Sequence, residues 1–354
     1  MTSSKNAFNR RAFICKSSFL LAGLLKAQPA TASGYNALQE NTVSSLSGSL
    51  DTHKLGTTLM HEHVLFGNIP ENLRSASVNI AVKMLNEATE AGVETIVDVS
   101  PYRDINLYRE IDDRTTINII ASTGYYKQDS TPSALVGQNE SAMEERIYRE
   151  VTEGIEGTKI RAGIIKVAAD HVPIPEWNKK VFRAAARVQK ATGIPIATHA
   201  WIGAREQFDL LVKTGADPNH INLSHVDTVN GWGGKTREKF AAELLPVVQA
   251  GGFLLFNNFS CEFYTPWVDL VYLLRYYCDQ GYAHRILISE DCNWEWKNGK
   301  QVFEAEEAHP EAAKRTYSYM MTHEVPLMLQ AGFTKKDMKT FLIDNPRNFF
   351  STKS

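Results

Sequence analysis

Cysteine is scarce in this sequence of 354 residues, which contains only four. Cys15 lies near the N-terminus, and Cys261, Cys278 and Cys292 follow at irregular spacings that match neither a disulfide framework nor a zinc finger. Hydrophobic residues make up 43% of the chain and charged residues 22%, which is ordinary for a globular protein that buries a large core. The fold therefore does not need disulfides, although an oxidising compartment would allow one pair of cysteines to form a disulfide.

An excess of basic charge is also missing. The formal net charge is −2, and it becomes −7 without residues 1–32, which carry five Lys and Arg and no acid. A mildly acidic protein offers no electrostatic attraction for nucleic acid or for an anionic membrane. We therefore expect neither nucleic acid nor a membrane as a partner of the mature chain.

The N-terminal segment lacks a hydrophobic run long enough to span a bilayer, because its apolar stretch covers only Phe19–Leu25. The stretch follows Arg10 and Arg11 and precedes a small-residue site at 30–32, which is the layout of a cleaved export signal. The paired arginines favour the twin-arginine type, and an ordinary secretory signal is the alternative. We predict that residues 1–32 are removed and that the twin-arginine export machinery is a partner.

The mature chain, 33–354, is expected to be periplasmic or secreted and to form a single domain. After a polar leader from 33 to about 50, eight β-branched runs alternate with amphipathic helical stretches that end at glycine. The predicted strands are 57–64, 94–100, 117–124, 161–168, 194–199, 220–225, 252–258 and 285–291. This alternation predicts a (β/α)8 TIM barrel. A doubly wound open sheet is the alternative, weakened because no glycine-rich phosphate loop follows the first strand.

Two histidines interrupt the first predicted strand, TTLMHEHVLF. His61 and His63 are two residues apart, so their side chains point to the same face of a strand. Glu62 points to the opposite face and is expected to be structural. The spacing also excludes the H-E-x-x-H metalloprotease motif, which needs a helix and an i, i+4 pair.

Polar residues also collect at the ends of other predicted strands. Lys166 lies near the end of the fourth, and His199, His225 and Asp291 close the fifth, sixth and eighth. Taken singly, such a histidine is usually a satisfied structural residue, a buried lysine is usually paired, and a strand-end aspartate often caps a helix. In a (β/α)8 barrel, however, the C-terminal strand ends form the catalytic face. Imidazole and carboxylate groups gathered there predict a site for divalent metal ions.

The other histidines outside the export signal are assigned no metal. They lie in predicted loops or helical stretches or, in one case, at the opposite end of the barrel: His53, His171, His220, His284, His309 and His323. His220 is the one at the opposite end, because it opens the sixth strand. This contrast supports a single cluster.

Several segments carry a resemblance to a known family: GTTLMHEHVL, GIIKVAAD, IPIATHA, INLSHVD, ILISED and the tail VPLMLQAGFTKKDMKTFLIDNPRNFF. In this order, over nearly the whole mature chain, they resemble the phosphotriesterase family of the amidohydrolase superfamily. The resemblance implies a metal-dependent hydrolase with two divalent ions per chain, Zn first and Mn, Co or Fe as alternatives. It also implies a small-molecule substrate, and a homodimer is compatible with it.

The resemblance also implies a role for each candidate residue. The two metals would share six ligands: His61, His63 and Asp291 on the more buried ion, His199 and His225 on the more exposed ion, and N6-carboxylated Lys166 bridging both. The ions lower the pKa of a shared water, so that hydroxide attacks the substrate at neutral pH. Asp291 is the expected proton acceptor, and Asp227 either joins that relay or has a loop or helix-capping role.

The segments after the strands would select the substrate. Tyr126 lies where lactonase-like relatives have a tyrosine near the metals, which favours a carbonyl substrate, and rim packing of Tyr125 and Tyr126 is the alternative. The segment FNNFSCEFYTPW begins at Phe256 and contains Asn257 and Asn258. It lacks the Asp-Arg pair that the lactonases carry after the seventh strand. It looks closer to the phosphotriesterase homology proteins, which include amide hydrolases.

Aromatic residues are expected to line the pocket. Trp294 and Trp296 follow Asp291 and suit an apolar or planar substrate group, and a hydrophobic plug that joins this segment to a partner subunit is the alternative. A second set of candidate lining residues follows the seventh strand, with a plain aromatic cluster as the alternative: Phe259, Glu262, Phe263, Tyr264 and Trp267.

The sequence thus predicts a metal-dependent hydrolase of a lactone or ester, with phosphotriester cleavage as a promiscuous activity. An amide hydrolase of the same family is the alternative within this class. A non-catalytic binding protein on the same barrel is the alternative from another class, and the intact ligand set argues against it.

Overall fold

The structure is a computed structural model that describes residues 41–351 except Phe66, Asn68 and Ser260. The described residues belong to one compact unit. The predicted export signal, 1–32, lies outside the described residues. None of the described helices is long and apolar enough to cross a membrane.

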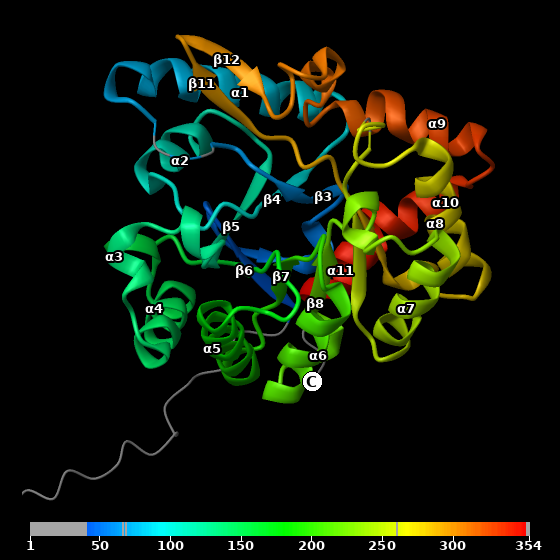
Figure 1. Ribbon diagram of the computed structural model, residues 1–354. Coiled ribbons are helices and arrows are strands. Elements are labelled where there is room, and N and C mark those ends of the chain that lie inside the picture. Colours follow the sequence, from blue (N-terminus) through cyan, green and yellow to red (C-terminus); the bar gives the residue numbers. More distant parts are fainter. Residues whose placement is uncertain (1–40, 66, 68, 260, 352–354) are drawn as a thin grey trace, which may run out of the picture. The chain divides into compact units, whose positions relative to one another are not determined.

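Eight strands form one sheet in chain order, and every neighbouring pair from the first to the last is parallel (Figure 1). They are β3 (Thr58–Glu62), β4 (Thr95–Asp98), β5 (Asn118–Gly124), β6 (Ile164–Ala168), β7 (Ile196–His199), β8 (Ile221–Ser224), β9 (Phe253–Phe256) and β10 (Ile286–Ile288). Each lies inside one predicted run. Because parallel strands are covered on both faces, their residues are buried almost without a break. The predicted (β/α)8 barrel is confirmed.

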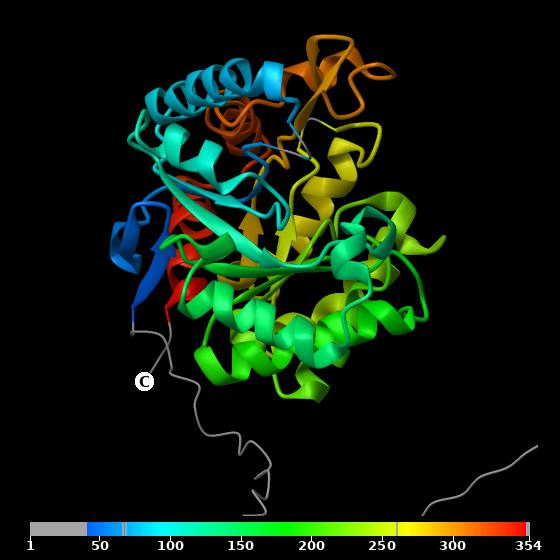
Figure 2. The same ribbon diagram turned by 90° about the vertical axis from the view of Figure 1, so that its left-hand side faces the viewer.

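Helices surround the strands on the outside (Figures 1 and 2). They are α1 (Arg74–Glu90), α2 (Ile105–Asp112), α3 (Ser133–Val136), α4 (Glu140–Thr152), α5 (Glu176–Thr192), α6 (Ala204–Thr214), α7 (Arg237–Gln249), α8 (Trp267–Asp279), α9 (Val325–Gln330), α10 (Lys335–Lys339) and α11 (Asn345–Phe350). The predicted glycine stops are clear at α5 and α6, where Gly193 and Gly215 adopt φ of 81° and 106°.

The barrel closes between its first and last strands, β3 and β10. Backbone hydrogen bonds join the residues just beyond β10 to β3: Asp291 N–H donates to His61 O at 3.1 Å, and His63 N–H donates to Cys292 O at 3.0 Å. The Ser289 hydroxyl adds an acceptor for His61 N–H at 2.8 Å. Candidate ligands from the two ends of the sheet are therefore neighbours only because the sheet closes.

The core has an inner and an outer layer. The outer layer packs the helices against the strands, and the inner cluster fills the barrel with one side chain from most strands, including Met60, Val97, Ile120 and Leu287. The filled interior leaves the C-terminal strand ends as the place for polar side chains.

Two antiparallel hairpins lie outside the predicted elements. The hairpin β1 (Thr42–Ser45) and β2 (Gly48–Asp51) falls in the segment expected to be a polar leader, and that expectation was wrong for these residues. Val43 explains why, because it joins the inner cluster. The hairpin β11 (Trp294–Lys297) and β12 (Lys300–Phe303) falls in the segment treated as a loop after the eighth strand.

Candidate metal centre

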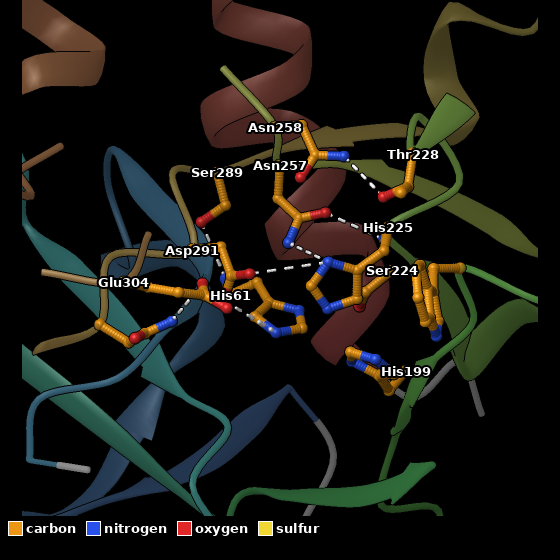
Figure 3. A network of polar contacts seen from close by, with 12 residues as sticks. His61, His199, Ser224, His225, Thr228, Asn257, Asn258, Ser289, Asp291 and Glu304 are labelled. Atoms are coloured by element: carbon orange, nitrogen blue, oxygen red, sulfur yellow. Dashed lines mark hydrogen bonds and ion pairs between the residues drawn. The ribbon is translucent and has the colours of Figure 1, made fainter. Parts of the chain in front are cut away.

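Three of the predicted ligands, His61, His63 and Asp291, meet at the seam where the barrel closes. Figure 3 shows two of them, His61 and Asp291. His61 is in β3 and His63 follows it, while Asp291 lies three residues beyond β10. The Nε2 atoms of His61 and His63 are 3.5 and 3.3 Å from Asp291 Oδ1. One ligand atom from each of the three residues lies within 4.8 Å of the others, which is close enough for one metal ion.

The other three predicted ligands adjoin this cluster. Lys166, in the middle of β6, is fully buried, and its Nζ is 3.2 Å from His61 Nε2. The ring of His225 is 4.7 Å from that of His61 and 4.3 Å from that of His199, centroid to centroid. The structure therefore brings all six predicted ligands to one place at the C-terminal face of the barrel.

The donor set fits divalent metal ions. His61 Nδ1 is buried and has no hydrogen-bond partner within the described part of the chain. Burial lowers the pKa of His225 to about 3 and the pKa values of His61 and His199 well below the usual range, so the imidazoles are neutral, as metal binding requires. Burial also lowers the pKa of Lys166 to about 7, which leaves a large fraction of its amine unprotonated at neutral pH.

Neighbouring side chains orient three of the histidines. His63 Nδ1 is 2.7 Å from the Ser100 hydroxyl, and His225 Nδ1 is 3.0 Å from Asn257 Nδ2. His199 Nε2 is 3.5 Å from Asp170 Oδ1. Such partners fix the ring orientation of metal-binding histidines. Sequence reasoning missed Asp170, although its position just after β6 was a usable signal.

Glu62 has the structural role that was expected of it. Its buried carboxylate accepts hydrogen bonds from the Ser289 hydroxyl at 2.6 Å, from Glu290 N–H at 2.8 Å and from Cys292 N–H at 2.7 Å. These donors flank Asp291. Glu62 therefore holds the segment that carries Asp291 against β3.

Arg315 supports the same segment and was not predicted. Its buried guanidinium donates to the carbonyl oxygens of Asn257 at 3.5 Å, Asp291 at 3.4 Å and Glu290. It therefore ties the segment after β9 to the segment after β10. The segment after the seventh strand contains no arginine, and nothing in the spacing of the sequence indicates that one arrives from a later segment.

Asp227 contacts the backbone of the segment after β9. Its carboxylate accepts from Asn257 N–H at 2.9 Å, from Asn258 N–H at 2.8 Å and from Asn258 Nδ2 at 3.1 Å. Burial raises the pKa of this carboxyl to about 7. These contacts favour the loop-organising alternative for Asp227, and its part in a proton relay stays a prediction.

The two adjacent tyrosines have different surroundings. Tyr126 borders the site, with its hydroxyl 3.4 Å from His199 Nδ1 and its ring edge-on to that imidazole. Tyr125 is fully buried and donates its hydroxyl hydrogen bond to Gln138. Packing therefore accounts for Tyr125, whereas Tyr126 faces the candidate ligands.

A pocket of two adjoining hollows, about 300 and 220 Å³, opens above the cluster. Both hollows are lined by Tyr126, His199, His225, Asp291 and Glu304. The other lining residues are mostly polar: His63, Lys127, Lys166, Trp201, Thr228, Asn258, Tyr264, Asn293, Glu295, Lys297 and Ala305. The pocket thus suits a small polar substrate.

The expected tryptophan wall was wrong. Trp294 is buried, and Trp296 Nε1–H donates to the Ser77 hydroxyl of α1 at 2.7 Å. Neither is among the described residues that line the pocket. Both pack within the chain itself, because alternate residues of β11 face opposite ways and Glu295 and Lys297 face the pocket instead. A plug against a partner subunit stays a prediction.

Some of the candidate residues after β9 line the pocket, and others pack elsewhere. Tyr264 lines the pocket, as expected. Phe259 is fully buried, Phe263 stacks on His309 at 3.9 Å between ring centroids, and Trp267 packs against the outer core. Glu262 accepts a hydrogen bond from Trp267 N–H at 3.3 Å. The aromatic-cluster alternative therefore holds for most of this set.

The remaining histidines stay outside the cluster. His220 Nδ1 is 2.8 Å from Phe349 O near the C-terminal helix α11. Within the described residues, the one group of three or more His, Cys, Asp and Glu side chains close enough to hold a metal is His61, His63 and Asp291.

The barrel and its ligand cluster define a class of proteins, the enzymes that build their active site at the C-terminal face of a (β/α)8 fold. A family model narrows this class, because the model of the phosphotriesterase family matches residues 41–350. The chain belongs to the phosphotriesterase family. The predicted family resemblance is therefore confirmed, and the chain is a hydrolase of that family.

Curated relatives cover most of the chain. The phosphotriesterase homology protein of Mycobacterium tuberculosis H37Rv is 30% identical in an alignment 334 positions long, which covers 87% of this chain and 97% of the relative. The aryldialkylphosphatase of Saccharolobus solfataricus is 29% identical, with 86% and 97% covered. The N-acetyltaurine hydrolase of Xenopus tropicalis is 26% identical, with 88% and 100% covered.

Solved structures agree on the fold. An organophosphorus hydrolase from Deinococcus radiodurans aligns with a TM-score of 0.78 and 28% identity, over 91% of this chain and all of that one. A second structure is of a protein whose organophosphate hydrolysis activity was engineered from a weak promiscuous lactonase template. It aligns with a TM-score of 0.76 and 28% identity, over 88% of this chain and 100% of that one.

Proposed function

We propose that this protein is a binuclear metal-dependent hydrolase that cleaves a carboxyl-type bond, a lactone or an ester. The observation that carries the proposal is the convergence of all six candidate ligands beneath a polar pocket. His61, His63 and Asp291 would hold one ion, and His199 and His225 the other. Two bound cations would supply a hydroxide at neutral pH and polarise the bond to be cleaved.

Lys166 would bridge the two ions as a carbamate. Its unprotonated nitrogen attacks the carbon of CO₂ and loses a proton, which converts a cationic side chain into an anion with two oxygens. The lowered pKa of about 7 supports this step, because the free amine is the reacting form. A free ammonium at this position, 3.2 Å from His61 Nε2, would repel a cation instead.

The other side chains of the site would bind the substrate and move its protons. Asp291 is held from three sides by Glu62, Arg315 and the β3 backbone, so its carboxylate is positioned to accept a proton released at the pocket floor. The Tyr126 hydroxyl reaches the same pocket beside His199 and would donate a hydrogen bond to the substrate carbonyl oxygen.

A lactone or ester is supported by Tyr126 and by the likeness to a structure engineered from a weak promiscuous lactonase. Phosphotriester cleavage would be a secondary activity, and the aryldialkylphosphatase of Saccharolobus solfataricus supports including it in any screen. Zinc is our first expectation for the metal.

An amide hydrolase is the second candidate. The charged pocket wall and the presence of Asn257 and Asn258 in place of an Asp-Arg pair favour it. The similarity to an N-acetyltaurine hydrolase points the same way.

A parallel substrate panel tests the proposal. The metal-loaded protein would be assayed with γ-lactones, aryl and alkyl esters, N-acetyl amides and a phosphotriester, beside the variants Tyr126→Phe and Tyr282→Phe. We expect the highest kcat/KM on a lactone or ester and a loss of about 10- to 100-fold in Tyr126→Phe, with Tyr282→Phe unchanged because its ring lies outside the pocket. A preference for amides would select the second candidate, and hydrolysis of none would favour a binding protein.

We also propose that residues 1–32 direct export by the twin-arginine route, so that the mature protein acts in the periplasm or outside the cell. The paired Arg10 and Arg11 support this, as does the fit between a route for folded proteins and a site that is loaded with metal before export.

A further inference from the structure

One acidic side chain of the pocket wall, Glu304, has no cationic partner in the part of the chain that the structure describes. It follows β12 and lines both hollows of the pocket, and its side chain is exposed to solvent. Figure 3 shows it among the residues of the site, near Asp291. Its role is not explained by the metal centre, since it is not among the clustered ligands.

The two lysines of the pocket wall outside the metal cluster are already neutralised. Lys127 forms an ion pair with Asp170. Lys297 Nζ is 3.2 Å from a carboxylate oxygen of Glu295 and 3.2 Å from one of Glu307. The wall therefore retains the negative charge of Glu304.

Asn293 holds the carboxylate of Glu304 in place. Asn293 Nδ2 donates a hydrogen bond to Glu304 Oε2 at 2.8 Å, and Glu304 N–H donates to Asn293 O at 3.2 Å. Asn293 is two residues beyond Asp291 in the chain and lines the same hollow. A side chain fixed by both its backbone and its carboxylate is better suited to select a substrate than a freely rotating surface acid.

The aromatic side of the pocket already accommodates an ammonium group. Lys127 Nζ lies over the ring of Tyr126 at 5.2 Å and over the ring of Trp201 at 5.9 Å from the centroid. Tyr264 lines the same hollow together with these rings and Glu304. Aromatic faces next to a carboxylate are the usual surroundings of a bound organic cation.

We propose that Glu304 is a specificity-determining residue and that the preferred substrates carry an ammonium group remote from the bond that is cleaved. The inference deepens the proposed function and rests on it, because it names the class of lactone or ester that this pocket takes. A substrate with an anionic group in the same place would be repelled by the Glu304 carboxylate.

Binding of a matched pair of alcohols tests the proposal without any turnover. Choline carries a quaternary ammonium, and 3,3-dimethylbutan-1-ol has the same shape without the charge. Titration calorimetry on the metal-loaded full chain would give the Kd of each for the parent, for Glu304→Gln and for Glu311→Gln. The glutamine variant keeps an oxygen for the Asn293 hydrogen bond, and Glu311 is an exposed acid that is not among the pocket-lining residues.

We expect choline to bind the parent at least about tenfold more tightly than the neutral alcohol. This preference falls to within about twofold in Glu304→Gln and is kept in Glu311→Gln. Equal affinities in the parent, including no measurable binding of either alcohol, overturn the proposal. A preference that survives in Glu304→Gln also overturns it, because the charge is then recognised elsewhere.

The acetate esters of the same two alcohols separate this proposal from the proposed function. Hydrolysis of both esters with a Glu304-dependent preference for the choline ester supports both proposals. A Glu304-dependent binding preference without ester or lactone hydrolysis contradicts the proposed function and leaves cation selectivity standing. Hydrolysis of both esters without a charge preference supports the proposed function and contradicts cation selectivity.

Discussion

At the residue scale, the candidate ligands His225 and Asp291 share an unusual backbone conformation. Their φ angles are 64° and 53°, in the left-handed region that residues other than glycine rarely adopt. Such a conformation costs of order 1–3 kcal/mol and persists only where the surroundings enforce it. Asn257 Oδ1 accepts from His225 N–H at 2.9 Å, and His61 O accepts from Asp291 N–H at 3.1 Å. The chain therefore maintains strain where it would aim two ligands at one site.

Burial of the histidines makes the stability of the metal-free protein depend on pH. In the unfolded chain a histidine takes up a proton as the pH falls below about 6.5. Burial holds the pKa of His225 at about 3 in the folded protein, so the unfolded state binds the proton first. We expect each such histidine to lower the free energy of unfolding by up to about 1.4 kcal/mol per pH unit as the pH falls from 6.5 toward 4.

The variant His225→Asn separates the effect of the histidine on stability from that of two buried acids, whose effect on stability has the opposite pH dependence. Burial raises the pKa values of Glu62 and Asp227 to about 7, so their contribution to stability is lost as the pH rises from about 4.5 to 7. The free energy of unfolding, measured by urea denaturation, should fall less between pH 6.5 and pH 4 in His225→Asn than in the parent. The exposed control His284→Asn should match the parent. Equal slopes in His225→Asn and the parent contradict the prediction.

At the element scale, the sequence of the β11–β12 hairpin contains a turn signal, although the segment was predicted to be a loop. Asn298 and Gly299 form its turn with φ of 51° and 73°, which is the Asn-Gly signal of a two-residue hairpin. The segment was treated as a loop, so Trp294 and Trp296 were both assigned to the pocket. Once the segment is a strand, the alternation of side chains sends Trp294 into the core and brings Glu295 to the pocket.

Gly299→Val tests the hairpin turn. A β-branched residue at a φ of 73° is strained, so we expect the free energy of unfolding to fall by about 1–3 kcal/mol in urea denaturation. Metal content should not change, because none of the six candidate ligands is in the hairpin. Gly137→Val is the matched control, since Gly137 has a φ of −75° and open space around its Cα. Loss of metal in Gly299→Val, or stability equal to the parent, contradicts the prediction.

At the scale of the whole molecule, the alternation of apolar runs and helical stretches was enough to predict the barrel. Each candidate ligand was found because a parallel barrel brings its strand ends to one face. Arg315 was not predicted for a physical reason, because it acts through a contact between segments far apart in the chain and belongs to no periodic pattern. Asp170, in contrast, follows the fourth strand as the candidate ligands follow theirs, so its position was a usable signal.

The export prediction also belongs to this scale. Replacement of Arg10 and Arg11 together by Lys keeps the charge of the segment but removes the paired guanidinium groups. We expect the precursor to accumulate in the cytoplasm, as judged by cell fractionation and by the mass of the protein. Normal export of the double variant would support the ordinary secretory alternative instead.

The most direct test of the account is the metal content per chain. Protein purified with zinc or manganese supplied would be analysed by mass spectrometry of the metals, beside Lys166→Ala and the exposed control Lys300→Ala. We predict about two ions per chain in the parent and in Lys300→Ala and a clear loss in Lys166→Ala. One ion or none in the parent, or two ions kept in Lys166→Ala, would contradict a binuclear centre bridged by this lysine.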